Sequence, residues 1–535
     1  MKLMTSSSLP VFLNKLFRFF QPNACLKDIP VMNVSAYLVL FMSFLQVSSS
    51  IDVTEVVFEG RDGRVLRRSE DSLSISGDWK KKGNDIFGHH YDDWFGRSVS
   101  LSQDGKTVAI SSHANGTWFN GQTTVFRYSS NMNTWDQLGQ RIEGEGTGDT
   151  SGRSISLSRN AKFLAIGSPH TRDRGGKLTG GTRIYEYDRE TMVWIQLGPI
   201  INGEEGYLCG SSVALADDGH MIAIACPKGK EDDSNFGRVR IFRLKREHSI
   251  NSWQQVGTDI LENEPRQLAS EWFPGRTIAV SGDGLKVAIG FSAYSTKNGR
   301  GVTKVYALNQ TTYSWNQCGN DIIGESEGDH SGVSVALSRN GSILAIGATH
   351  DDNEIMGHDT GSAKVFQFNS NLKLWDNLGQ SLHGSEGGSY SGNSVSLSDD
   401  GSYVAIGTFK NGRENSYTTV YSINPDTNVW TRLGPKIESS SGDAGTYSGY
   451  SVSLSGDGKT VAIGAPGDGG SMRRSGLTHI FTFEIITPTI SPSPSISSRF
   501  PSVVYDDLDS SGSFTSMMMS VFVILLQLVI LPPLL

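Results

Sequence analysis

The chain lacks the residue patterns that usually indicate catalysis, metal binding or nucleic-acid binding. Four cysteines among 535 residues are too few for a disulfide scaffold, and a net charge of −8 provides no basic surface for nucleic acid. No Ser/His/Asp, Cys/His or zinc-type spacing is present, so no catalytic or metal-binding residue is assigned. Catalytic carboxylates that are far apart in the sequence would leave no motif, and an enzyme therefore stays among the alternatives.

Amphipathic helices are lacking as well, and a repeated pair of strands takes their place. In the stretch 449–466, Val452 and Leu454 alternate with serines, Asp457-Gly458 is typical of a hairpin turn, and the residues after the turn alternate again. The first glycine of the unit recurs at Gly96, Gly152, Gly210, Gly275, Gly332, Gly392 and Gly449. These seven copies, about 59 residues apart, indicate a repeat architecture.

Two further strands accompany each copy. A strand with a tryptophan precedes the unit, at Trp79, Trp135, Trp194, Trp253, Trp315, Trp375 and Trp430. An aromatic strand follows it, at Phe126, Tyr185, Phe242, Tyr306, Phe366, Tyr421 and Phe481. Four strands in each of seven repeats predict an all-β fold, a seven-bladed β-propeller of four-stranded antiparallel blades, over residues 73–486.

The glycine motifs resemble a known family. Phe95-Gly96 and Gly464-Ala465-Pro466 resemble FG-GAP repeats, which form the seven-bladed propeller of integrin α chains. The resemblance covers residues 79–485 and implies that the Ser-Val-Ser-Leu strand is innermost in each blade. It also implies that the Trp79 strand completes the last blade and closes the ring. Integrin propellers bind calcium between the first two blade strands, but here that connection is a short turn with too few carboxylates for Ca²⁺. No cofactor is therefore expected.

The first 72 residues have the features of a secretory leader and a linker. Within residues 1–50, basic residues precede the apolar run 37–45, and small residues follow it, as in a signal peptide. Met32 would begin a shorter, more ordinary signal peptide, and a retained signal anchor is the alternative. Residues 51–72 are interpreted as a linker, with processing at Arg67-Arg68 as the alternative.

The other end has the features of a stalk and a lipid-anchor signal. Residues 487–509 are rich in Pro, Ser and Thr, as in an extended stalk. Within 510–535, small residues, a polar spacer and the apolar tail 521–535 follow in the order of a GPI-anchor signal that is removed, with the lipid on Ser510 or Ser511. A terminal membrane helix is the alternative, although such a helix needs about 20 apolar residues. We expect a secreted protein, anchored to the outer leaflet of the plasma membrane.

One end of the predicted propeller carries both kinds of long connection, and we call it the upper face. Asp92, Asp93, Asp149 and Asp329 precede inner strands on this face. They form either a calcium-binding or cation-attracting surface, or a solvated rim in which Asp149 and Asp329 accept hydrogen bonds from their own glycine-rich turns. We favour the rim.

Aromatic residues gather in the same loops. Three tryptophans outside the repeat positions fall there, and several aromatic residues stand just before inner strands, where they would ring the mouth of the central channel. They either stack on a sugar or peptide ligand or plug the hub. The candidate ligand-binding set comprises Trp94, Trp118, Trp272, Phe273, His330, Tyr390 and Tyr447, with Asp92, Asp93, Asp149 and Asp329.

Three smaller features complete the candidate sites. His89-His90 stands beside Asp92-Asp93, but adjacent residues on an extended chain point apart, so no metal site is assigned. A turn would bring Cys209 and Cys226 together, and a disulfide and two free thiols are the alternatives. Asn115 and Asn309 begin glycosylation sequons.

These features predict a monomeric cell-surface propeller for recognition or adhesion. Its ligand would be a carbohydrate or a protein, bound by the upper face. A secreted carbohydrate-active enzyme on a propeller scaffold and a structural wall or coat protein are the alternatives, because a fold alone does not fix a function.

The lipid anchor is directly testable. Phosphatidylinositol-specific phospholipase C is expected to release the protein from intact cells, because cleavage of a GPI anchor leaves no apolar segment in the membrane. Release is followed by immunoblot of the medium, and the mature mass is measured in parallel. A cell-bound protein whose mature mass includes residues 521–535 would contradict the anchor.

Overall fold

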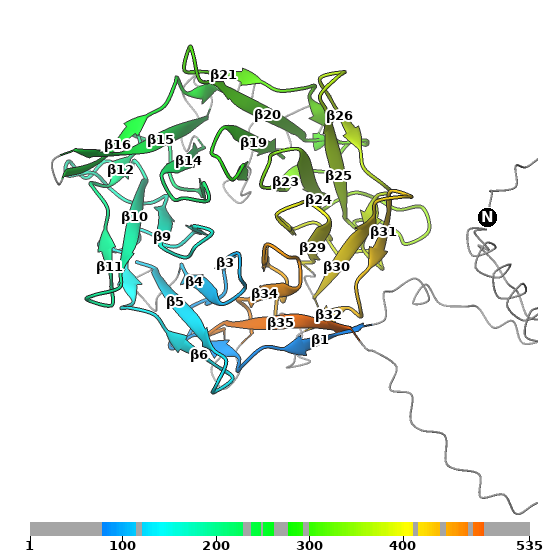
Figure 1. Ribbon diagram of the computed structural model, residues 1–535, viewed down its shortest axis with the longest axis horizontal. Helices are drawn as coiled ribbons and strands as arrows, with labels where there is room; N and C mark the ends of the chain where they lie inside the picture. Colours follow the sequence, from blue (N-terminus) through cyan, green and yellow to red (C-terminus); the bar gives the residue numbers. More distant parts are fainter. Residues whose placement is uncertain are drawn as a thin grey trace, which may run out of the picture. The chain divides into compact units, whose positions relative to one another are not determined.

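A computed structural model describes residues 77–113, 120–227, 237–247, 250–261, 277–292, 299–409, 416–438, 446–468 and 474–485. These residues form seven antiparallel sheets set around a central axis, as Figure 1 shows. The all-β, seven-bladed propeller is thus confirmed. No helix able to cross a bilayer occurs in the described ranges. The predicted leader, linker, stalk and anchor signal lie outside them.

Each blade begins with two strands joined by a tight turn near the axis. The innermost strands alternate apolar residues with serine or alanine, and the second strands are buried along almost their whole length. The innermost strands are β3 (Ser98–Leu101), β8 (Ser154–Leu157), β13 (Ser212–Leu215), β18 (Ile278–Val280), β23 (Ser331–Leu337), β28 (Ser394–Leu397) and β33 (Ser451–Leu454). The second strands are β4 (Thr107–Ser112), β9 (Phe163–Ser168), β14 (Met221–Cys226), β19 (Lys286–Phe291), β24 (Ile343–Ala348), β29 (Tyr403–Gly407) and β34 (Thr460–Ala465).

The third and fourth strands carry the aromatic residues and the repeat tryptophans outward. The third strands are β5 (Gln122–Ser129), β10 (Gly181–Asp188), β15 (Arg238–Glu247), β20 (Val302–Asn309), β25 (Ser362–Asn369), β30 (Tyr417–Asn424) and β35 (Leu477–Ile485). The outer strands are β1 (Gly77–Lys81), β6 (Thr134–Gln137), β11 (Val193–Gln196), β16 (Ile250–Gln255), β21 (Ser314–Gln317), β26 (Leu374–Asn377) and β31 (Val429–Arg432).

A short fifth strand, which the sequence did not predict, follows each outer strand and returns to pair with the third strand of the same sheet. These strands are β2 (Ile86–Phe87), β7 (Ile142–Glu143), β12 (Ile201–Asn202), β17 (Ile260–Leu261), β22 (Ile322–Ile323), β27 (Leu382–His383) and β32 (Ile437–Glu438). They lead the chain from the outer rim towards the next inner strand. Blades 1 to 7 are numbered below by their inner strands, from β3 to β33.

The ring closes as the family resemblance implied. Strand β1, from the beginning of the propeller, pairs antiparallel with β35 from its end, and Trp79 lies opposite Phe483. Blade 7 therefore contains the sheet order β1-β35-β34-β33, which Figure 1 shows in blue and orange. This pairing removes the two free strand edges that an open ring would expose.

The repeat tryptophans join each blade to the one before it. All seven donate the indole N–H to a backbone carbonyl of the preceding blade, at 2.6–2.9 Å: Trp79 to Leu433, Trp135 to Lys82, Trp194 to Leu138, Trp253 to Leu197, Trp315 to Val256, Trp375 to Cys318 and Trp430 to Leu378. A glycine follows each acceptor. Gly139, at φ +76°, shows why, because a Cβ there would lie 2.7 Å from the ring of Trp194.

The serines of the inner strands form a second joint between blades. The hydroxyls of Ser451 and Ser453 accept hydrogen bonds from the backbone N–H groups of Val99 and Leu101 in the next blade, at 3.1 and 3.0 Å. Equivalent bonds link several other neighbouring blades. The small face of each inner strand is therefore hydrogen-bonded as well as packed, because these N–H groups have no strand partner on the axis side.

The lower end of the channel contains a closed circle of peptide hydrogen bonds. One residue in each inner hairpin donates its N–H to the carbonyl of the next: Gln103 to Arg159, Arg159 to Asp217, Asp217 to Gly282, Gly282 to Arg339, Arg339 to Asp399, Asp399 to Gly456 and Gly456 to Gln103, at 2.7–3.2 Å. The guanidinium of Arg159 also reaches from blade 2 to the carboxylate of Asp399 in blade 6. Side chains and peptide groups thus occupy the lower mouth.

Loss of ring closure is expected to destabilise the whole propeller. Deleting residues 73–87 removes β1 and β2, and with them the buried Trp79, so the cost should be at least the roughly 3–5 kcal/mol of losing one buried tryptophan. Thermal unfolding by circular dichroism measures it. A matched deletion of residues 51–70 should leave the unfolding temperature unchanged. Equal unfolding temperatures for the full and the 73–87-deleted protein would show that closure contributes nothing.

Candidate functional site

The upper mouth of the channel is built by one backbone feature that recurs around the ring. Six described residues, each two positions before the first glycine of a repeat, have left-handed φ values of 46° to 57°: Trp94, Thr150, Leu208, His330, Tyr390 and Tyr447. This conformation is rare outside glycine. It occurs whatever the side chain is, so the backbone is a property of the repeat, whereas the side-chain identities distinguish one blade from another.

Aromatic side chains from three blades form the first cluster at this mouth. The rings of Trp94 and Tyr447 stack with centroids 6.3 Å apart and planes 11° apart. Phe409, directly after the second strand of blade 6, stacks on Tyr447 at 5.0 Å and meets Tyr450 edge-on at 5.6 Å. The guanidinium of Arg474 lies 5.6 Å from the centre of the Trp94 ring. All four rings are half-buried, so part of each faces solvent.

A second cluster lies on blades 5 and 6. The rings of His330 and His350 are 4.2 Å apart, and His350 meets Tyr390 at 5.1 Å. His330 is buried, and burial, with a smaller effect of His350, lowers the pKa of His330 to about 4. Burial also lowers the pKa of His350, although Asp359 and Asp352 oppose it. Both rings are therefore neutral at physiological pH and act as aromatic surface.

The predicted aspartates mostly support the loops that hold these clusters. Asp149 accepts a hydrogen bond from the N–H of Gly146 at 2.9 Å, and Asp329 accepts one from Ser326 at 2.7 Å. Asp93 accepts from the N–H groups of His89 and His90, at 3.1 and 2.7 Å, whereas Asp92 is only half-buried. Three of the four carboxylates are buried caps of their own turns, and burial raises the pKa of Asp329.

Exposed carboxylates of the upper face are also paired within the protein. Glu145 lies 2.7 Å from Arg183, Glu204 lies 3.1 Å from Arg238, and Glu325 lies 2.9 Å from Lys364. The acidic surface expected from the sequence is thus largely neutralised by cations on the third strands. Within the described ranges, no group of three His, Cys, Asp or Glu side chains is arranged to hold a metal ion.

Basic residues that sequence reasoning missed stand at the centre of the mouth. Arg97 and Arg153 each directly precede an inner strand, in blades 1 and 2. Burial, with repulsion from Arg153, lowers the pKa of Arg97 to about 10, and the Arg97 guanidinium lies 4.4 Å from the centre of the Tyr450 ring. Burial, together with repulsion from Arg97, Arg153 and His170, lowers the pKa of His113 to about 3. Arg97 and Arg153 share the position directly after the first glycine of a repeat, and this position was the sequence signal that could have identified them.

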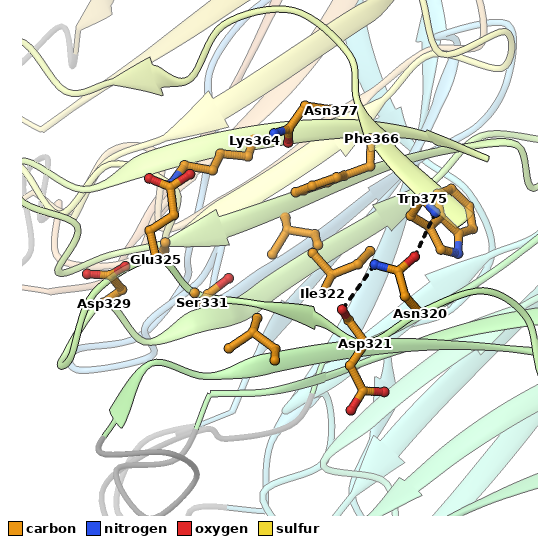
Figure 2. Close-up of a pocket in the computed structure, with 14 residues that line it drawn as sticks. Asn320, Asp321, Ile322, Glu325, Asp329, Ser331, Lys364, Phe366, Trp375 and Asn377 are labelled. Carbon is orange, nitrogen blue, oxygen red and sulfur yellow. Dashed lines mark hydrogen bonds and ion pairs between the residues drawn. The ribbon is translucent and has the colours of Figure 1, made fainter. Parts of the chain in front are cut away.

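A separate cavity of about 200 Å³ lies between blades 4 and 5. Figure 2 shows that Asn320 and Lys364 border it, together with the rings of Phe366 and Trp375. Its polar groups serve the fold: Asn320 accepts from the backbone N–H of Trp375 at 2.8 Å, and Lys364 contacts Glu325 at 2.9 Å and Asp351 at 3.5 Å. We therefore place the candidate site at the upper mouth rather than in this cavity.

The remaining predicted residues divide into described and undescribed positions. Cys209 and Cys226 form a disulfide, which joins the start of blade 3's inner strand to the end of its second strand. Asn309 is exposed at the end of β20. Trp118, Trp272, Phe273, Asn115, Ser510 and Ser511 lie outside the described residues, so the mouth is drawn from Trp94, His330, Tyr390 and Tyr447 among the predicted aromatic residues.

Comparisons with known proteins support the repeat type and leave the ligand open. A family model described as the FG-GAP repeat matches residues 432–481, which contain Gly449 and Gly464-Ala465-Pro466. No curated protein matches the chain. Among solved structures, a candidate 6-phosphogluconolactonase from Bacteroides uniformis is 13% identical, with a TM-score of 0.45, covering 68% of this chain and 89% of its own.

Two further solved structures are similarly distant. A periplasmic gluconolactonase from Pseudomonas aeruginosa is 13% identical with a TM-score of 0.44, over 68% of this chain and 89% of its own. A protein from Lactobacillus plantarum is 12% identical with a TM-score of 0.40, over 64% and 84%. Likeness at this level carries no argument about what this chain binds.

The depressed pKa of His113 predicts acid sensitivity. The folded state holds the ring neutral down to about pH 3, whereas the unfolded chain protonates it near pH 6.5. The unfolded state therefore binds more protons in this window, and stability is lost as pH falls from 6.5 towards 3. We expect His113 to account for about 2–4 kcal/mol of that loss, less than the full shift implies because part of the residue is exposed to solvent.

Urea unfolding from pH 7 to pH 4 checks this expectation. His113→Gln should flatten the decline in unfolding free energy with falling pH. A change at the exposed His220, His220→Gln, should keep the decline of the wild type. Parallel declines in wild type and His113→Gln would contradict a buried neutral His113.

Proposed function

We propose that this seven-bladed β-propeller, which carries FG-GAP repeats, is a recognition or adhesion protein of the cell surface. Its ligand is a carbohydrate or a protein, and its binding site is the upper mouth of the channel. The leader-like sequence, the stalk and the anchor-like tail support an extracellular, membrane-tethered location. A tethered propeller would present one end of its channel to ligands outside the cell.

The observation that carries the proposal is the run of stacked aromatic rings at the mouth. Trp94, Tyr447 and Phe409 come from three different blades and stack in sequence, with part of each ring exposed. A core has no need to leave such rings half-open, whereas binding sites are enriched in Trp and Tyr. The opposite end of the channel presents no comparable surface, because Arg159 and Asp399 fill it.

The backbone around the rings supports a preformed site. The left-handed φ of Trp94 and Tyr447 and the hydrogen bonds from the N–H of Trp94 to Arg474 and of Tyr450 to Tyr447 fix the loop positions. Binding then requires little ordering of the protein, which lowers its entropic cost. Left-handed backbone at residues other than glycine is often found at ligand sites, although here it occurs at the same position of six repeats.

Substitution of the central tryptophan tests the proposal. Trp94→Ala is expected to weaken binding by about 1–3 kcal/mol, the loss typical of a hot-spot aromatic residue. The protein is first screened against glycan and cell-surface arrays, and affinities for the hits are measured by biolayer interferometry. Tyr447→Ala should behave in the same way.

Stability measurements separate recognition from packing. Tyr313→Ala removes an exposed aromatic residue from a turn at the lower end and should leave affinity unchanged. The Asp104→Asn and Asp400→Asn changes in lower turns should also leave binding intact. An unfolding temperature that falls sharply in Trp94→Ala, with unchanged affinity of the folded fraction, would assign the rings to hub packing instead.

A further inference from the structure

The most unusual charges of the propeller are the cations at its upper mouth. Several other cations at the upper face are paired with carboxylates: Arg183 with Glu145, Arg238 with Asp259, and Lys364 with Glu325. Arg97 and Arg153 form no ion pair with any carboxylate in the part of the chain that the structure describes. Burial lowers the pKa of the neighbouring His113 and His170, so both rings are neutral at physiological pH and the positive charge of this cluster belongs to the two arginines.

Burial makes this arrangement costly for the free protein. The Nε of Arg97 and the Nδ1 of His113 are buried, and neither has a hydrogen-bond partner. A buried donor without an acceptor loses its hydration and gains nothing in return, and the cost is larger when the group is charged. An anion seated beside Arg97 would supply the missing acceptor and offset the repulsion between Arg97 and Arg153.

The rest of the mouth indicates what kind of anion fits. The Arg97 guanidinium lies over Tyr450, which meets Phe409, and Phe409 continues through Tyr447 to Trp94. The successive planes are 25° and 11° apart, so the three rings form one nearly parallel apolar stack beside the charge, with part of each ring exposed. A pyranose ring presents a flat face of C–H groups, and a uronic acid carries its carboxylate directly on that ring. A guanidinium matches a carboxylate with two parallel hydrogen bonds.

We propose that the upper mouth binds an acidic carbohydrate, with the carboxylate of a hexuronate held by Arg97 and Arg153 and the sugar face on the Trp94–Tyr447–Phe409 rings. The inference rests on the proposed recognition function and specifies its ligand class. Arg97 and Arg153 supply charge complementarity, and the aromatic rings supply contact area. His113 meets the ring of Trp94 at 6.2 Å, and His170 lies 2.8 Å from the hydroxyl of Thr150, so both border the same mouth.

Paired ligands that differ only in charge give the sharpest test. The probes are an oligogalacturonate and the same oligomer with its carboxylates methyl-esterified, titrated into the purified full chain by isothermal calorimetry. The acid is expected to bind at least tenfold more tightly than the ester, and its affinity should fall with added salt because charge is screened.

Matched variants assign the effect to the site. Arg97→Gln and Arg153→Gln should each weaken binding of the acid at least tenfold, whereas Lys106→Gln, at the other end of the β3–β4 hairpin, should leave it unchanged. Arg97→Gln should not lower the unfolding temperature of the free protein, because it removes an unpaired buried charge. If Arg97 had only a structural role, Arg97→Gln would lower the unfolding temperature and leave binding of the acid unchanged.

The outcomes distinguish this inference from the recognition function itself. Equal affinity for acid and ester, with Arg97→Gln and Arg153→Gln silent, would overturn the anion site. If array ligands still bound through Trp94, recognition would stand. A polyglutamate peptide that binds through Arg97 when the oligogalacturonate does not would overturn the carbohydrate assignment. Failure of every probe and of the arrays would overturn both proposals.

Discussion

Closure of the ring is the constraint on which the other features depend. An open ring of blades would leave an unpaired strand edge at each end. The pairing of β1 with β35 removes both edges by joining the two ends of the propeller in one sheet. Once the ring is closed, every blade has two neighbours, and the same joint can be made seven times. The indole bonds of the repeat tryptophans and the circle of peptide bonds at the lower mouth each complete a full turn only because the first and last strands share one sheet. The bonds from Val99 and Leu101 in blade 1 to the serines of blade 7 depend on the same closure.

The sequence predicted the parts of this architecture that repeat. The tryptophans, the glycine motifs and the hairpin turns recur at fixed spacing, so the blade count, the order of strands and closure by the Trp79 strand could be inferred. Contacts between blades could not be inferred, since they depend on register. In the sequence, Ser451 and Ser453 are only the small residues of an alternating strand. In the structure, their hydroxyls accept hydrogen bonds from the backbone N–H groups of Val99 and Leu101 in the next blade. Arg159 and Asp399 are 240 residues apart and meet only across the axis.

The candidate site shows the same division. Trp94, His330, Tyr390 and Tyr447 were predicted because a repeat position just before an inner strand must face the mouth. Arg97 and Arg153 were missed although both directly follow the first glycine of a repeat, and Phe409 and His113 were missed because each lies just after a second strand, at a position that the repeat pattern does not mark. The acidic composition of the upper loops suggested a negatively charged surface. In the structure, Asp93, Asp149 and Asp329 accept hydrogen bonds from their own turns, and Glu145, Glu204 and Glu325 are ion-paired. The number of acidic residues in these loops therefore described the charge at the mouth poorly, because Arg97 and Arg153 there form no ion pair with any carboxylate of the described residues.

The Arg159–Asp399 contact across the lower mouth affects the kinetics of ligand binding. With Arg159 reaching Asp399 inside a circle of peptide groups, the lower end of the axis is occupied by the protein itself, so a ligand would enter by the upper mouth. Whatever enters it must leave through the same opening, and water displaced by an incoming molecule must pass that molecule on its way out. Association and dissociation then share one narrow route, so a lid or a neighbouring molecule over the upper face would slow both equally. Residence time could be tuned in this way without any change in affinity.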